Sequence, residues 1–321
     1  KRQPSDTIAR MKRLFDVYLA VDWSARSKPG PAAPAQDALW VGEAFAPGLA
    51  EAEAPRESYW RTRRACRDYL RARLLEHIQA GRRVFIGCDF PYGYPSGLAQ
   101  ALSLSESVPP WRRIWNELSR LIADDASNAN NRFEVANALN ARCAGPTPGP
   151  FWGCPAGTAF GNLLPTSPRY PYQTRAGPAL ERLRQTERLA RGTQPGWKLY
   201  GTGSAGGQAL LGIPVVCRLR DDPALAGVSR VWPFETGFTT LPTPKDGPTI
   251  IHAEIWPGLV SDQLDRALPI RDQAQVRAAA RWLARLDDAG QLGTLFNPPA
   301  AHSSGMSDRY SEEEGWILGV R

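Results

Sequence analysis

The 321-residue chain has few of the residues on which several common kinds of site depend. It has three histidines, and none of them belongs to a His-Glu-x-x-His zinc motif. Its five cysteines are widely spaced and include no Cys-x-x-Cys pair, which argues against a cysteine zinc site and against a disulfide framework. Catalysis by a histidine-assisted serine or cysteine would have to use His252 or His302, and no motif marks either residue.

The chain also lacks a run of 18 apolar residues, so the sequence predicts no transmembrane helix. The N-terminal residues carry charge but no apolar core followed by a cleavage site, and we therefore expect a cytoplasmic protein. Residues 1–10 precede Met11 and are interpreted as an extension outside the fold. The 42% hydrophobic and 22% charged content is ordinary for a globular protein and allows a single domain over residues 11–321.

Lysine is scarce as well. The chain has five lysines, so 34 of its 39 basic residues are arginines, and its net charge is +7. This charge is compatible with nucleic acid or a phosphate-bearing small molecule as partner. Heavy use of Arg, Ala, Pro and Gly also arises from GC-rich coding, so the charge alone identifies no partner. The arginines between residues 61 and 73 are interpreted as the solvated face of a helix.

Alternating strand-like and helix-like segments predict an α/β fold. Strands are expected at 17–25, 38–46, 83–89, 213–220, 230–236 and 249–258, with the second antiparallel to the first. Helices are expected at 57–81, 109–126, 131–143 and 178–192, and one more begins near Asp272. Residues 144–178 are rich in Pro, Gly and aromatic residues and predict an ordered covering loop, inside an inserted irregular and helical region at about 95–210.

Two of the predicted strands end in a carboxylate, which strand interiors disfavour. Asp22 closes the strand in VYLAVDWSA and Asp89 closes the one in RVFIGCDFPYG, while Glu254 ends a third strand and Asp272 opens a helix. Such a set of rigidly held oxygen ligands suits Mg²⁺ or Mn²⁺ and two-metal phosphoryl chemistry. The competing interpretation is structural, because Asp89 could accept turn hydrogen bonds and Asp272 could cap its helix.

The segments VYLAVDWSA, IGCDFPYG, VWPFETG, AEIWPG, RDQAQV and EEEGWILG, taken in order, resemble an uncharacterised family of predicted nucleases with an RNase H-like fold. The resemblance covers residues from about 17 to 319. It implies a mixed five-stranded sheet whose first three strands are antiparallel, flanked by helices and carrying a large insertion. It also implies that Asp22, Asp89 and Asp272 are metal ligands on the first strand, the fourth strand and the last helix.

The resemblance leaves the remaining ligand open. Ribonucleases H have a glutamate near the start of the first helix, where this chain offers Glu57. The family pattern points instead to Glu254, which we expect to be the ligand, because Glu57 suits a helix-dipole role.

The stretch GTGSAG at 201–206 matches the Gly-x-Gly-x-x-Gly pattern. A dinucleotide-binding fingerprint needs a strand before this pattern and a sustained helix after it, and Gly-Ile-Pro at 212–214 is expected to break such a helix. The stretch is therefore expected to form a tight turn, or to approach a phosphate through its backbone amides. Ser24, Arg26, Gly203 and Ser204 are the candidate substrate-binding residues.

These patterns together predict a metal-dependent phosphodiester hydrolase that uses Asp22, Asp89, Glu254 and Asp272 with two Mg²⁺ or Mn²⁺ ions. One alternative is an ATP-dependent phosphotransferase of the actin/hexokinase type, which needs a glycine-rich loop in the first hairpin. The 26–37 loop has one glycine, which counts against that alternative. A second alternative is a non-catalytic accessory protein of a biosynthetic pathway. The 144–178 cover favours a small enclosed substrate over a long duplex.

Overall fold

The computed structural model describes residues 13–49, 56–302, 305 and 307–321; the predicted extension at 1–10 and Met11 lie outside the described residues. At its centre is a mixed six-stranded sheet with the order β3-β2-β1-β4-β6-β5. β2 runs antiparallel to β1 and β3, and all other neighbours are parallel. The strands are β1 Val17–Asp22, β2 Leu39–Phe45, β3 Arg56–Trp60, β4 Arg83–Cys88, β5 Ser229–Val231 and β6 Thr249–Glu254.

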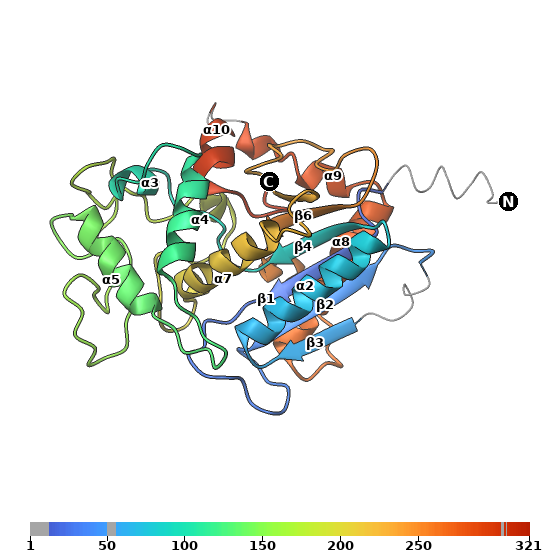
Figure 1. Ribbon diagram of the computed structural model, residues 1–321, viewed down its shortest axis with the longest axis horizontal. Coiled ribbons are helices and arrows are strands. Elements are labelled where there is room, and N and C mark those ends of the chain that lie inside the picture. The colour runs from blue at the N-terminus through green and yellow to red at the C-terminus, as the bar shows by residue number, and fades with distance from the viewer. Residues whose placement is uncertain (1–12, 50–55, 303–304, 306) are drawn as a thin grey trace.

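The central strand β1 is buried on both faces, and its alternating side chains belong to two separate cores. Leu19 packs on the side of helix α2 (Arg63–Gln79) and Tyr18 on the side of helix α8 (Arg271–Asp288). Gly42 of β2 allows α8 to come close, because a Cβ at this position would lie 2.5 Å from a backbone oxygen of α8. The sheet is therefore covered by a helix on each face, and Figure 1 shows α2 crossing the face nearer the viewer.

The chain between β4 and β5 forms a region of helices and irregular segments beside the sheet, on the left in Figure 1. Its helices are α3 Leu98–Ala101, α4 Pro110–Leu121, α5 Arg132–Cys143, α6 Gln185–Leu189 and α7 Ala205–Arg220. Residues 144–178 contain no helix or strand, and their buried side chains, Phe151, Leu163 and Tyr172 among them, belong to the core on the α2 side. α4 and α7 pack against each other.

Short helical segments close the chain around β6. They are η1 Pro257–Gln263, α9 Leu292–Leu295, η2 Pro299–Ala301, α10 Ser307–Arg309 and η3 Tyr310–Glu314. After them, Ile317 forms an isolated bridge with Glu254 at the end of β6. None of the helices in the described part of the chain is long and apolar enough to cross a lipid bilayer.

The α/β prediction is confirmed, as is the antiparallel pairing of the first two strands. The prediction of one helix over 57–81 is wrong at its start, because residues 56–60 form the edge strand β3. Thr62 then caps α2 by accepting a hydrogen bond from the N–H of Ala65 at 3.2 Å. The helix predicted at 178–192 is reduced to the five residues of α6.

The strand predicted at 213–220 is wrong, because these residues form the second half of α7. Twelve of the sixteen residues of this helix are buried, and an apolar run buried on all sides has no periodicity that separates a helix from a strand. The helix also continues through Gly212, where a Cβ would lie 2.3 Å from the ring of Phe90. Close packing, and not a break in the helix, explains this glycine.

Candidate functional site

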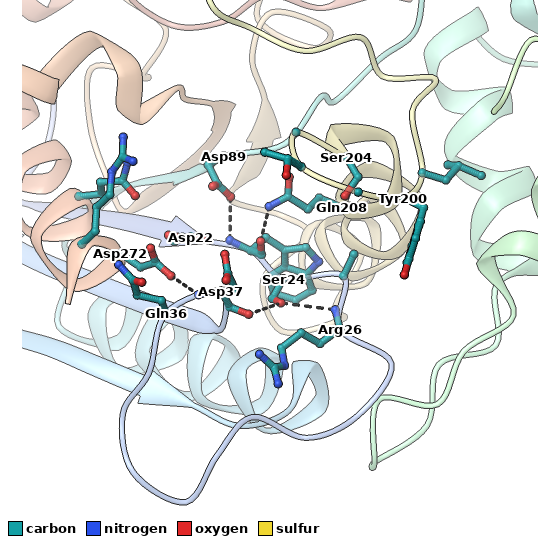
Figure 2. Close-up of a pocket in the computed structure, with 18 of the residues that line it drawn as sticks. Asp22, Ser24, Arg26, Gln36, Asp37, Asp89, Tyr200, Ser204, Gln208 and Asp272 are labelled. Atoms are coloured by element: carbon teal, nitrogen blue, oxygen red, sulfur yellow. Dashed lines mark hydrogen bonds between the residues drawn. The ribbon is translucent and has the colours of Figure 1, made fainter. Parts of the chain in front are cut away.

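A pocket of about 870 Å³ opens at the carboxyl ends of β1 and β4. Seven of the eight predicted site residues line it: Asp22, Ser24, Arg26, Asp89, Gly203, Ser204 and Asp272. Figure 2 shows the aspartates grouped on one side of the pocket and Ser204 and Tyr200 on the other. The structure thus brings together residues that lie up to 250 positions apart in the sequence.

Asp22 and Asp89 form the acidic centre of the pocket. Val21 of β1 pairs with Cys88 of β4, so the two aspartates leave neighbouring parallel strands at the same level. Asp89 accepts a hydrogen bond from the N–H of Trp23 through Oδ1 at 2.7 Å, which fixes its carboxyl group beside the end of β1. The negative charge of Asp89 raises the pKa of the Asp22 carboxyl, so the two carboxyl groups interact.

Burial dominates the protonation of this pair. Burial raises the pKa of the Asp22 carboxyl well above its usual range, and the negative charges of Asp89 and Asp272 raise it further. Burial also raises the pKa of Asp89, against the opposing effect of the hydrogen bond from the N–H of Trp23. The raised pKa values therefore favour a proton or a cation on this pair.

Asp272 and Asp37 complete the acidic side of the pocket. Asp272 is the second residue of α8, and its Oδ2 accepts a hydrogen bond from the N–H of Asp37 at 2.6 Å. Asp37 has a left-handed φ of 54°, and its carbonyl oxygen accepts a hydrogen bond from Ser24 Oγ at 3.0 Å. Asp37 was not among the predicted site residues, although an acid directly before a predicted strand is a usable signal.

Arg63 fixes the backbone beneath the pocket. Its Nη1 donates to the carbonyl oxygens of Ser24 at 3.0 Å and Arg26 at 2.7 Å, and its guanidinium forms a two-point ion pair with Asp124, both distances being 2.6 Å. Its side chain is 1% exposed. The interpretation of Arg63 as part of a solvated face is therefore wrong, whereas its neighbour Arg64 is exposed.

The acidic group of the pocket has no cationic partner in the described part of the chain, unlike several other buried acids. Asp287 is also buried without an ion pair among the described residues, but it accepts hydrogen bonds from two backbone N–H groups and the hydroxyl of Tyr18. Glu43 pairs with Arg73 and His77, and Glu187 pairs with Arg184. Within residues 13–49, 56–302, 305 and 307–321, no Arg, Lys or His forms an ion pair with any of the three acids Asp22, Asp89 and Asp272. Unpaired buried acids are costly, which points to a function that needs them.

Glu254, the fourth predicted ligand, does not line this pocket. Its carboxylate accepts two hydrogen bonds from Arg184, at 2.6 and 2.7 Å, and one from the N–H of Tyr92 at 3.0 Å. The expectation that Glu254 joins the other three acids is therefore corrected: its charge is already neutralised by a buried arginine of the inserted region. Glu57, the alternative, lies on β3 and pairs with Arg277.

The oxygen donors of the pocket suit a hard divalent cation that keeps part of its hydration shell. Among the described residues, no group of three or more His, Cys, Asp or Glu side chains stands in an arrangement that could hold a metal ion. Mg²⁺ is commonly bound by one or two carboxylates, with water and substrate phosphate oxygens as its other ligands. The facing carboxyl groups of Asp22 and Asp89 fit this smaller requirement, in place of the four ligands that the sequence predicted.

The glycine-containing stretch 201–206 lies between an irregular segment and α7. The expectation that no sustained helix follows it is wrong, since α7 has sixteen residues. No strand leads into it, however, because Lys198 forms only an isolated bridge with Trp152. The stretch is therefore no dinucleotide fingerprint, and Gly203 and Ser204 line the acidic pocket instead.

Comparison of the chain with protein-family models, with curated proteins and with solved structures gives no match.

The raised pKa values of Asp22 and Asp89 predict a stability that depends on pH in the absence of divalent cations. The folded protein keeps protons that the unfolded chain releases near pH 4, so its free energy of unfolding falls as pH rises from 5 to 7. Asp22→Asn removes one of these groups. Between pH 5 and 7, its free energy of unfolding relative to that of wild type should therefore rise by roughly 1 kcal/mol per pH unit. Urea denaturation in EDTA measures the difference, with the exposed Asp68→Asn as control. Parallel pH profiles for wild type and Asp22→Asn would contradict this assignment.

The ion pair of Glu254 with Arg184 predicts a structural role. Glu254→Gln removes one of the two carboxylate partners of the buried Arg184, which keeps its ion pair with Glu187, and should lower the free energy of unfolding by about 1.5–3 kcal/mol. Its affinity for Mn²⁺, measured by electron paramagnetic resonance on the folded variant, should equal that of wild type and of the exposed control Glu106→Gln. A Glu254→Gln protein of normal stability that binds Mn²⁺ weakly would show that Glu254 is a ligand after all.

Proposed function

We propose that this protein is a metal-dependent hydrolase that acts on phosphodiester bonds. The observation that supports the proposal is the pair of Asp22, which is buried, and Asp89, which is half-buried, at the ends of two parallel strands with no cationic partner among the described residues. Two such carboxyl groups repel each other once both are ionised, and a divalent cation removes that repulsion.

Asp22 and Asp89 would hold Mg²⁺ or Mn²⁺. When bound, such an ion polarises a phosphoryl oxygen and activates water at neutral pH. Trp23 orients Asp89 through its backbone N–H, and Arg63 holds the backbone of Ser24 and Arg26 in place. Asp272 adds negative charge beside the pair. It also fixes the end of the 26–37 loop by accepting a hydrogen bond from the N–H of Asp37. These residues thus preorganise the site before substrate binds.

We further infer that the core is RNase H-like. The order β3-β2-β1-β4-β6, with only β2 running antiparallel to its neighbours, supports this inference, as does the position of the acids. Asp22 and Asp89 end β1 and follow β4, and Asp272 opens the long helix that comes after β6. The short strand β5 extends the far edge of this sheet.

The phosphotransferase alternative requires a phosphate-binding loop between β1 and β2. The single glycine of the 26–37 loop, Gly30, donates its N–H to the carbonyl oxygen of Arg61 at 2.8 Å. A Cβ at Gly30 would lie 2.5 Å from the hydroxyl oxygen of Tyr59, so this glycine serves close packing. The amides of the first hairpin therefore favour the hydrolase over the phosphotransferase.

The proposal predicts that removing one charge from the acidic pair abolishes hydrolysis without unfolding the protein. Asp22→Asn and Asp89→Asn should each lower the rate of Mn²⁺-dependent cleavage of bis(p-nitrophenyl) phosphate by about a thousandfold, because each loses a ligand that helps stabilise the charge of the transition state. EDTA should stop the wild-type reaction, and Mn²⁺ should restore it. The exposed Asp68→Asn, with an unchanged rate, is the matched control.

Thermal melts of the same proteins separate chemistry from folding. Both variants should melt at or above the wild-type temperature in EDTA, since each removes like-charge repulsion. Full activity in EDTA, or normal activity of Asp22→Asn in Mn²⁺, would rule the proposed function out.

A further inference from the structure

The side of the pocket opposite Asp272, where Figure 2 shows Tyr200 and Ser204, offers hydrogen-bond donors. It is formed by residues 199–204 and by Gln208 of α7. None of the backbone N–H groups from Gly201 to Ala205 donates a hydrogen bond to another described residue, and the hydroxyl of Ser204 does not cap the helix. Gly201 and Gly203 have left-handed φ values of 85° and 71°, which glycine alone adopts readily. These donors stand at the N-terminus of a sixteen-residue helix, where the helix dipole favours an anion.

Arg132, the first residue of α5, brings a buried positive charge to the same side of the pocket. The residue is 6% exposed, and its Nη1 donates to Ser27 Oγ at 2.9 Å and Asn130 Oδ1 at 2.8 Å. Its Nε is buried without a hydrogen-bond partner among the described residues. A Cβ placed on Gly207, in the first turn of α7, would lie 3.6 Å from this Nε. Arg132 therefore packs against the start of α7 and also lines the pocket.

Arg132 differs from the two other buried arginines. Arg63 pairs with Asp124 and Arg184 with Glu254, whereas no carboxylate pairs with Arg132 in the part of the chain that the structure describes. Its guanidinium lies 4.2 Å from the ring centroid of Phe133, which restricts its position. Burial and the charge of Arg63 lower the pKa of Arg132 to about 10, as expected for a guanidinium that lacks an anion.

We infer that the 201–204 loop, the first turn of α7 and Arg132 form a subsite for a phosphate group of the substrate. The inference rests on the proposed function: the hydrolase would act on a small molecule that carries a second phosphate near the ester it cleaves. Phosphate, with more oxygens than a carboxylate, suits a guanidinium combined with several amides. The same Cβ on Gly207 would lie 3.3 Å from Ala25, three residues after Asp22, so the subsite adjoins the acidic pair.

The size of the pocket limits the substrate further. Its volume of about 870 Å³ lies within the range of small-molecule sites, which is roughly 300–1,000 Å³. A phosphorylated compound the size of a nucleotide therefore suits this pocket better than a nucleic-acid duplex.

Calorimetric titration of inorganic phosphate into EDTA-treated protein at pH 7 tests the subsite without using catalysis. Wild type should bind phosphate, and Arg132→Gln should bind it about tenfold more weakly or worse, because it loses a charge-assisted donor. Arg64→Gln, an exposed arginine on α2, should bind phosphate like wild type. Acetate should bind more weakly than phosphate, and equal affinity would overturn the assignment to phosphate.

Two more variants distinguish loss of the phosphate subsite from loss of hydrolysis and from unfolding. Asp22→Asn should keep its phosphate affinity in EDTA, so the subsite can stand even if the proposed hydrolysis fails. Arg132→Lys keeps the charge but loses the planar fork of guanidinium donors, and it should bind phosphate several-fold more weakly with a normal thermal melt. Wild-type phosphate binding that requires Mn²⁺, or equal affinity of wild type and both Arg132 variants, would overturn the inference.

Discussion

Two carboxyl groups, Asp22 and Asp89, lie side by side at the ends of neighbouring strands, and the surrounding structure keeps them there. The register of β1 against β4 sets their spacing, and the N–H of Trp23 fixes Asp89. Because both groups cannot be ionised together at low cost, the pair needs a proton or a cation. Because β1 and β4 are paired in the sheet, the two carboxyl groups cannot move apart to relieve this repulsion.

Most of the other buried acids have a cationic partner, and this makes the pocket stand out. Glu43, Glu187 and Glu254 each have an arginine partner. The pocket has an acidic group without an ion pair among the described residues on one side and Arg132, which no described carboxylate pairs with, on the other. A bound cation and a bound phosphate would complete both sides, which is the arrangement that a phosphate-ester substrate provides.

The acidic pair could be predicted from the sequence because its signal is local: an apolar strand ending in Asp predicts where that side chain lies. The same holds for Asp272 at the start of α8. Glu254 had an equally good local signal, but its partner Arg184 lies 70 residues away in an irregular region, where local patterns carry no information. The roles of Arg63 and Arg132 were missed for the same reason. Helix α7 was divided wrongly because its burial removes the helical periodicity.

A proton and a divalent cation should compete for the carboxyl groups of Asp22 and Asp89. Titration calorimetry at pH 6.5, in two buffers with different enthalpies of ionisation, tests this competition by counting the protons released when Mn²⁺ binds. The account predicts that wild type releases about one proton per Mn²⁺ bound. Asp22→Asn should bind Mn²⁺ far more weakly, whereas the exposed Asp68→Asn should match wild type. Mn²⁺ binding to wild type without proton release, or binding that Asp22→Asn leaves unchanged, would contradict the account.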